Sequence, residues 1–132
     1  MTVVVDASVV AAALVDSGSL GRTARERLPS EPLVAPHLMP VEVASVLKRA
    51  ELSGDFSSGE AEVAHSQLLD IPVALFPYEP FAQRVWDLRQ SLTPYDAWYV
   101  ALAEELDATL VTLDSRLARA HGPSCHIEVL RP

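Results

Sequence analysis

The segment Val3-Val4-Val5-Asp6-Ala7-Ser8, residues 3–8, indicates how this chain folds. Three β-branched residues in a row predict a short buried strand, because such side chains favour an extended backbone and pack well in a sheet. The run ends at an acid, and residues 8–15 then predict a helix. A buried strand that leads into a helix is typical of a parallel sheet covered by helices.

The alternation of strands and helices continues to the end of the chain. Further strands are predicted at residues 33–35, 73–76, 109–113 and 127–130. Further helices are predicted at residues 20–28, 40–52, 58–69, 81–91, 94–106 and 115–120. Pro29 should end the second helix, and Pro40 suits the first turn of the third. Because helices separate the strands, we expect an α/β fold with a mostly parallel sheet flanked on both faces.

Length and composition bound the class of protein. The chain has 132 residues, of which 49% are hydrophobic and 21% charged, and it shows no repeat or linker. We therefore expect residues 1–132 to form a single globular domain. No apolar run approaches the ~20 residues that span a bilayer. The start lacks the basic region of a signal peptide, and the single cysteine can form no internal disulfide, so a cytoplasmic location is expected.

The charge of the chain narrows the possible functions. Its formal net charge is -8, which argues against a protein that coats nucleic acid with lysine and arginine. Carboxylates that hold cations can still meet phosphates through those cations. The acidic balance therefore leaves a metal-dependent nuclease open.

Four acids occupy positions that should converge. Asp6 ends the first predicted strand and Asp114 the fourth, while Glu42 and Asp96 lie in the first turns of two predicted helices. In an open α/β sheet, strand ends and nearby helix starts gather at the carboxyl edge, where ligands bind. On the helix of residues 40–52, Glu42 also falls at the border of the apolar face, which suits the wall of a cleft.

Each acid also has a purely structural explanation. Asp6 and Asp114 could cap the helices that follow their strands. Asp96 lies three residues after Thr93, as in a capping box, and Glu42 could favour the positive end of a helix dipole. Taken one at a time, these explanations are at least as good as a functional one, because acids are common near helix starts.

Four converging carboxylates would require a cation. Two of them ~5 Å apart repel by roughly 3 kcal/mol at an effective dielectric of 20. The acids must then bind a positive ion or raise their pKa values. A site made only of oxygen atoms suits Mg²⁺ or Mn²⁺, which also bind phosphate oxygens.

Four blocks of the sequence resemble a known family. They are Val-Val-Val-Asp6-Ala-Ser8, Pro40-Val-Glu42-Val-Ala, Thr93-Pro-Tyr-Asp96-Ala-Trp-Tyr-Val-Ala-Leu-Ala and Leu-Val-Thr112-Leu-Asp114-Ser-Arg-Leu. In this order they resemble PIN-domain proteins, and most of all the VapC toxins of bacterial toxin–antitoxin pairs. The resemblance covers nearly the whole chain.

The resemblance implies a three-layer α/β/α sandwich and an endoribonuclease that depends on Mg²⁺ or Mn²⁺. It implies that Asp6, Glu42, Asp96 and Asp114 bind the metal and are catalytic, although ligation at the position of Asp114 varies in the family. Ser8 and Thr112 match hydroxyl positions that could support these acids. A homodimer, an RNA substrate and a VapB-like antitoxin that inserts a basic side chain are implied as well. The acidic charge would favour such a partner.

Two other functions can be weighed against the nuclease. A non-catalytic PIN-fold protein, an RNA-binding or scaffold module, would be favoured by the loss of an acid, but all four are present. A phosphoacceptor of the receiver type needs a lysine at a late strand end. The chain has one lysine, Lys48, and it lies in a predicted helix.

Several other polar and aromatic residues allow more than one interpretation. Arg116 is a candidate phosphate contact, since it follows Asp114. A solvated helix face is the preferred interpretation of Arg22, Arg25 and Arg27. A surface turn is preferred to a zinc site for His121, Cys125 and His126. Packing or dimer contacts are preferred to base stacking for Trp98, Tyr99 and Leu102.

Overall fold

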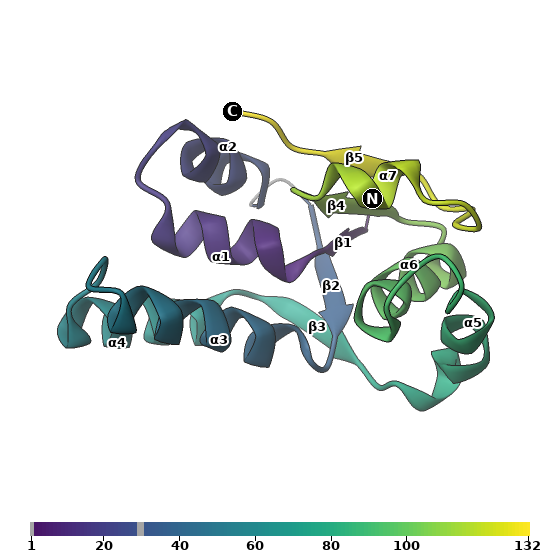
Figure 1. Cartoon of the computed structure of the whole chain (residues 1–132), viewed down its shortest axis with the longest axis horizontal. Helices are drawn as coiled ribbons and strands as arrows, with labels where there is room; N and C mark the ends of the chain where they lie inside the picture. Colours follow the sequence, from purple (N-terminus) through teal and green to yellow (C-terminus); the bar gives the residue numbers. More distant parts are fainter. Residues whose placement is uncertain (1, 29–30) are drawn as a thin grey trace.

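A computed structural model describes residues 2–28 and 31–132. Its centre is a five-stranded sheet in the order β3-β2-β1-β4-β5, in which every neighbouring pair is parallel (Figure 1). The strands are β1 (Val3–Val5), β2 (Leu33–Pro36), β3 (Val73–Phe76), β4 (Thr109–Thr112) and β5 (Ile127–Val129). The predicted α/β fold with a parallel sheet is confirmed.

Helices cover the sheet on both sides. They are α1 (Ala7–Val15), α2 (Ser19–Arg27), α3 (Met39–Leu52), α4 (Ser58–Asp70), α5 (Ala82–Asp87), α6 (Pro94–Leu106) and α7 (Ser115–Arg119), with a short 3₁₀ helix η2 (Glu79–Phe81). Figure 1 shows α1, α3 and α4 on one side of the strands, and α5 and α6 on the other. This is the arrangement that right-handed crossovers produce when the chain first builds the sheet toward β3 and then returns toward β5.

The strand order places a switch point between β1 and β4. From β1 the chain proceeds to β2 and β3 on one side, and it later adds β4 and β5 on the other. The carboxyl ends of β1 and β4 lie side by side, since Val5 pairs with Val111 and the Asp6 N–H donates to the Val111 carbonyl over 3.0 Å. Ligands of open α/β sheets bind at such a point, because the adjacent crossovers leave in opposite directions.

Helix α6 is deeply buried in the core. It contacts β1, β2 and β4, and its residues Ala97 and Tyr99–Ala103 are all buried. Small alanine side chains let this helix lie close to the sheet. The helix begins as predicted: Thr93 is the N-cap, its hydroxyl accepts from the Asp96 N–H, and Pro94 occupies the first turn.

The main difference from the predicted elements lies between residues 79 and 93. A helix was expected over 81–91, but the structure has η2, then α5 ending at Asp87, then turns. The Leu88 N–H is shared between the carbonyls of Arg84 and Val85, which tightens the backbone toward 3₁₀ geometry. The chain must then become extended at Thr93, since the residue before a proline disfavours the helical region.

Smaller differences concern the end of helix α2 and the strand at the edge of the sheet. The expected stop at Pro29 falls outside the described residues, and the described helix α2 ends at Arg27. Strand β3 lies at the edge of the sheet and is half exposed, so its apolar residues are less buried than those of β1. No helix in the described part of the chain has both the length and the apolar character to cross a membrane.

A candidate site of four acids at the switch point

Asp6 is a buried acid held by two hydroxyl groups. Its side chain is 9% exposed, and its Oδ2 accepts hydrogen bonds from Ser8 Oγ at 2.8 Å and Thr112 Oγ1 at 2.7 Å. It occupies the N-cap position of α1, yet its carboxylate makes no capping bond. The capping explanation is therefore wrong for Asp6. Its Oδ1 accepts no hydrogen bond from residues 2–28 and 31–132, so that oxygen remains free for a ligand.

Ser8 and Thr112 connect Asp6 to the end of β4. Ser8 Oγ accepts from the Leu113 N–H at 3.2 Å, and Thr112 Oγ1 accepts from the Asp114 N–H at 3.1 Å. Because each hydroxyl accepts a backbone N–H, its own proton is directed to the carboxylate of Asp6. The two hydroxyls that the resemblance singled out thus fix the position of the buried acid.

Glu42 lies half-buried in the first turn of α3. Its Oε1 accepts a hydrogen bond of 2.7 Å from the hydroxyl of Tyr99 in α6. Burial raises the pKa of Glu42, the Tyr99 hydrogen bond lowers it, and the charges of Asp6 and Asp96 raise it further. The dipole explanation is therefore incomplete, since Glu42 also has a specific partner and two acidic neighbours.

Asp96 uses its backbone to start α6, while its carboxylate remains at the site. Its N–H donates to Thr93 Oγ1 at 3.2 Å, but within the described ranges no return bond from the carboxylate to the Thr93 N–H is present. Burial raises the pKa of Asp96, the charges of Asp6 and Asp114 raise it further, and the Thr93 side chain and the charge of Arg116 lower it. Only half of the expected capping box is formed.

Asp114 is the acid that the structural explanation describes best. Its Oδ1 accepts from the Arg116 N–H at 2.9 Å, which caps α7, and the Arg116 guanidinium binds both carboxylate oxygens at 3.1 and 3.0 Å. The hydrogen bond from Arg116 lowers the pKa of Asp114. A pocket of about 240 Å³ lies between this ion pair and the start of α6, with Thr93 and Asp96 in its lining. Asp114 thus faces the site but already has a cationic partner.

The four acids form one electrostatic neighbourhood. Asp6 raises the pKa of both Glu42 and Asp96, and Asp114 raises that of Asp96. In the part of the chain that is described, no three carboxylate, imidazole or thiol groups are already arranged to hold a metal ion. The donor set consists of carboxylate oxygens, which is the chemistry that a hard divalent cation prefers.

Tyr99 is a site residue that the sequence interpretation missed. It was expected to serve packing or dimer contacts, and its ring is indeed buried, but its hydroxyl binds Glu42. The available signal was its position three residues after Asp96, on the same face of the helix. Leu102 does pack in the core, while Trp98 is half-buried and its ring meets that of Tyr78 edge-on at 5.3 Å.

Two of the three arginines of α2 make specific contacts with other parts of the fold. Arg25 is exposed, as a solvated face predicts, although it also donates to the carbonyls of Ala13 and Asp16. A solvated face is wrong for Arg27, which is half-buried and forms ion pairs with Glu31 and Glu128. The contacts of Arg25 follow from the packing of α2 on α1, whereas Arg27 joins α2 to β5 through Glu128. Arg22 is exposed, as expected.

The segment of His121, Cys125 and His126 lies away from the four acids. Both histidines are exposed and the cysteine is half-buried. Burial raises the pKa of the Cys125 thiol to about 11. A thiol that stays protonated at neutral pH is a poor metal ligand, which agrees with a structural turn.

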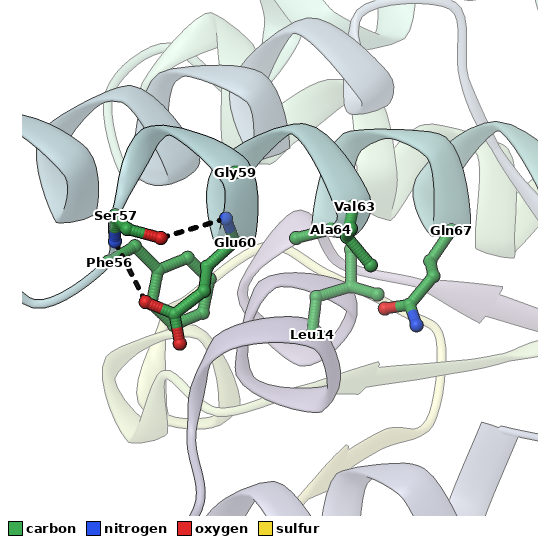
Figure 2. A pocket seen from close by; sticks show the side chains of 8 residues that line it. All are labelled: Leu14, Phe56, Ser57, Gly59, Glu60, Val63, Ala64 and Gln67. Atoms are coloured by element: carbon green, nitrogen blue, oxygen red, sulfur yellow. Dashed lines mark hydrogen bonds between the residues drawn. The ribbon is translucent and has the colours of Figure 1, made fainter.

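A separate groove of about 600 Å³ lies between α1 and α4. Figure 2 shows Leu14 of α1 opposite Val63 and Ala64 of α4. Phe56 and Glu60 line this groove and also a neighbouring hollow that contains further acids, Asp16 and Asp55. The groove is therefore apolar in its floor and acidic at its rim.

Comparisons with known proteins agree with this geometry. A family model described as PIN domain matches residues 3–123. The chain is 41% identical over 129 residues to Ribonuclease VapC1 of Mycobacterium tuberculosis, with 97% of each chain covered. It is 38% identical over 128 residues to Ribonuclease VapC12 of the same organism, and this alignment covers 97% of this chain and 98% of that protein.

Solved structures share the fold at lower sequence identity. FitAcB from Neisseria gonorrhoeae matches with a TM-score of 0.71 at 14% identity, over 96% of each chain. VapC20 of Mycobacterium tuberculosis, described as a Sarcin-Ricin loop cleaving toxin, matches with a TM-score of 0.69 at 17% identity, over 89% of this chain and 93% of that one.

Proposed function

The chain belongs to the PIN-domain family, and on this basis we propose that it is an endoribonuclease of the VapC type. It hydrolyses RNA phosphodiester bonds as the toxin of a toxin–antitoxin pair and thereby inhibits growth or translation. The observation that carries this proposal is the buried carboxylate of Asp6, which two hydroxyl groups hold at the switch point beside Glu42 and Asp96. A helix-capping role explains the position of Asp114, but it does not explain the arrangement of Asp6, Glu42 and Asp96.

We propose that Asp6, Glu42 and Asp96 bind Mg²⁺, or Mn²⁺ in its place, with Asp114 as a fourth acid. The all-oxygen donor set and the mutual repulsion of the acids support this assignment. When bound, such an ion supplies Lewis-acid stabilisation to phosphate oxygens. Ser8 and Thr112 keep Asp6 in one orientation throughout, because their protons are committed to its Oδ2.

RNA cleavage by the purified chain tests the function. The wild type and the Asp6→Asn variant are incubated with RNA of mixed sequence and Mg²⁺ or Mn²⁺, each with and without an excess of EDTA. Cleavage only by the wild type, and only with free metal, is the expected result. Mapping the cut ends of cellular RNA after induced expression would then identify the target.

We propose that Arg116 contacts an RNA phosphate near Asp114. Its side chain is 82% exposed, so it can exchange its carboxylate partner for a phosphate at little cost. Arg116→Glu should weaken RNA binding several-fold when measured by fluorescence anisotropy in the inactive Asp6→Asn background. Arg22→Glu is the matched control, since Arg22 is also exposed but lies on α2. Equal affinity of the Arg116→Glu and parent proteins would contradict this role.

A VapB-like antitoxin is the proposed protein partner, and the groove between α1 and α4 is its proposed docking site. The apolar floor and acidic rim favour a helix with one apolar face and basic residues beside it. The net charge of -8 favours the same kind of partner. A homodimer is a further proposal from the family resemblance, and sedimentation equilibrium would test it.

Val63→Glu should weaken binding of the candidate antitoxin by roughly 10-fold or more, because it places a charge on the apolar floor of the groove. The fold should tolerate the change, since the Val63 side chain is 59% exposed. Leu69→Glu is the control: Leu69 is on the same helix and 68% exposed but does not line the groove. Calorimetric titration measures both variants, and an equal loss of affinity in the two would place the interface elsewhere.

A further inference from the structure

The hydroxyl of Tyr99 joins two helices at the base of the site. Tyr99 is 2% exposed, and its hydroxyl donates to Glu42 Oε1 at 2.7 Å, across 57 positions of sequence. Tyr99 comes from α6 and Glu42 from α3, which follow different strands. Burial raises the pKa of Tyr99 most, and the charges of the nearby Glu42 and Asp6 raise it further, so the hydroxyl remains a donor close to two of the four acids.

Helix α6 contributes to the site twice. Asp96 lies in its first turn, and Tyr99 follows three residues later, so the two side chains share one face of the helix. One rigid, buried helix therefore supplies an acid directly and also binds the acid of another helix. The relative positions of Glu42 and Asp96 depend on this connection.

A buried tyrosine hydroxyl needs some partner, and satisfaction of that need alone is the simpler explanation. The partner, however, is Glu42, one of the four acids, and this argues that the hydrogen bond also has a role in the site. A half-buried carboxylate has two oxygens that can rotate, and this bond holds one of them. Within residues 2–28 and 31–132, Oε2 of Glu42 accepts no hydrogen bond, so the tyrosine leaves one oxygen fixed and the other available.

We propose that Tyr99 is a positioning residue, whose hydroxyl holds Oε1 of Glu42 so that the other carboxylate oxygen is presented to a divalent cation shared with Asp6 and Asp96. This inference rests on the proposed function. Residues that orient metal ligands typically change metal affinity by 10–100-fold when they are removed.

Binding of Mn²⁺, measured by the electron paramagnetic resonance signal of the free ion, tests the proposal without any RNA. Tyr99→Phe removes one oxygen atom and keeps the ring, and it should weaken Mn²⁺ binding about 10-fold. Tyr78→Phe is the control, because Tyr78 is 38% exposed and its ring contact with Trp98 needs no hydroxyl. It should bind Mn²⁺ like the wild type. Circular dichroism melts ensure that every titration is made on folded protein.

A double-mutant cycle separates positioning from a general loss of packing. In the Glu42→Gln background, Tyr99→Phe should cause little further loss of Mn²⁺ affinity, because the group it positions is already absent. An equal loss in both backgrounds would show that Tyr99 acts through the fold and would overturn the proposal. Unchanged binding by Tyr99→Phe would overturn it as well. A wild type that binds no Mn²⁺ would instead refute the metal site on which the inference rests.

Discussion

Asp6→Asn is expected to reduce RNA cleavage by ~100-fold or more while the protein remains folded. Both hydroxyls that bind Asp6 donate to the same oxygen, Oδ2. The amide oxygen of asparagine can replace that atom and keep both bonds. The amide NH₂ then replaces Oδ1, the oxygen that is free for a ligand, and an NH₂ group cannot bind a cation. The change removes one charge and one ligand but almost no packing.

Initial rates with a labelled RNA and Mn²⁺ measure this effect, and circular dichroism confirms the fold. Asp70→Asn is the control, since Asp70 is an exposed acid at the end of α4. Asp114→Asn should lose less activity than Asp6→Asn, because Asp114 already caps α7 and pairs with Arg116. Cleavage by Asp6→Asn at the wild-type rate would refute the catalytic proposal.

Thr112→Val is expected to lower the free energy of unfolding by about 1.5–3 kcal/mol and Mn²⁺ affinity by roughly 10–100-fold. Thr112 is fully buried, and valine has nearly the same shape, so no cavity results. The loss comes from two hydrogen bonds: the hydroxyl donates to Asp6 and accepts from the Asp114 N–H. Without it, a buried carboxylate and a backbone N–H at the end of β4 both lose a partner.

Urea unfolding of the metal-free protein measures the free energy of unfolding, and titration with Mn²⁺ measures the metal affinity. Thr109→Val is the control, because Thr109 lies on the same strand, is only partly buried, and has no side-chain hydrogen bond to the described residues. That variant should match the wild type in both measurements. If Thr112→Val were as stable as Thr109→Val, the hydrogen bond to Asp6 would contribute nothing to the fold.

Two acids of the site, Glu42 and Asp96, oppose the stability of the metal-free protein when they are ionised. The pKa values of Glu42 and Asp96 are raised, mainly by burial, so the folded state favours their protonated forms. The stability they contribute is present below their ordinary pKa values and is lost as the pH rises through the raised ones. Ionising both carboxyls in the folded state therefore costs free energy, and a bound cation would relieve that cost.

Local signals in the sequence were sufficient for most of the fold. The strand of residues 3–5 and the helix start at Thr93 and Pro94 were predicted correctly, because β-branched residues and capping residues act within a few positions of themselves. The prediction failed after Asp87, where the chain must turn to prepare the next helix start. That turn is determined by the following segment and not by the helix-forming residues before it.

The sequence by itself determined which four acids could meet, since strand ends and helix starts of a parallel sheet share one edge. Only the tertiary structure decided how they differ. Asp6 and Asp114 both follow a strand and precede a helix. Asp6 is bound by hydroxyls from two elements, whereas Asp114 is bound by the backbone and the side chain of Arg116 in the helix that it precedes. Capping depends on neighbours in sequence, whereas the contacts of Asp6 with Thr112 and of Glu42 with Tyr99 join residues 106 and 57 positions apart. Contacts of that kind form only when the helices pack on the sheet.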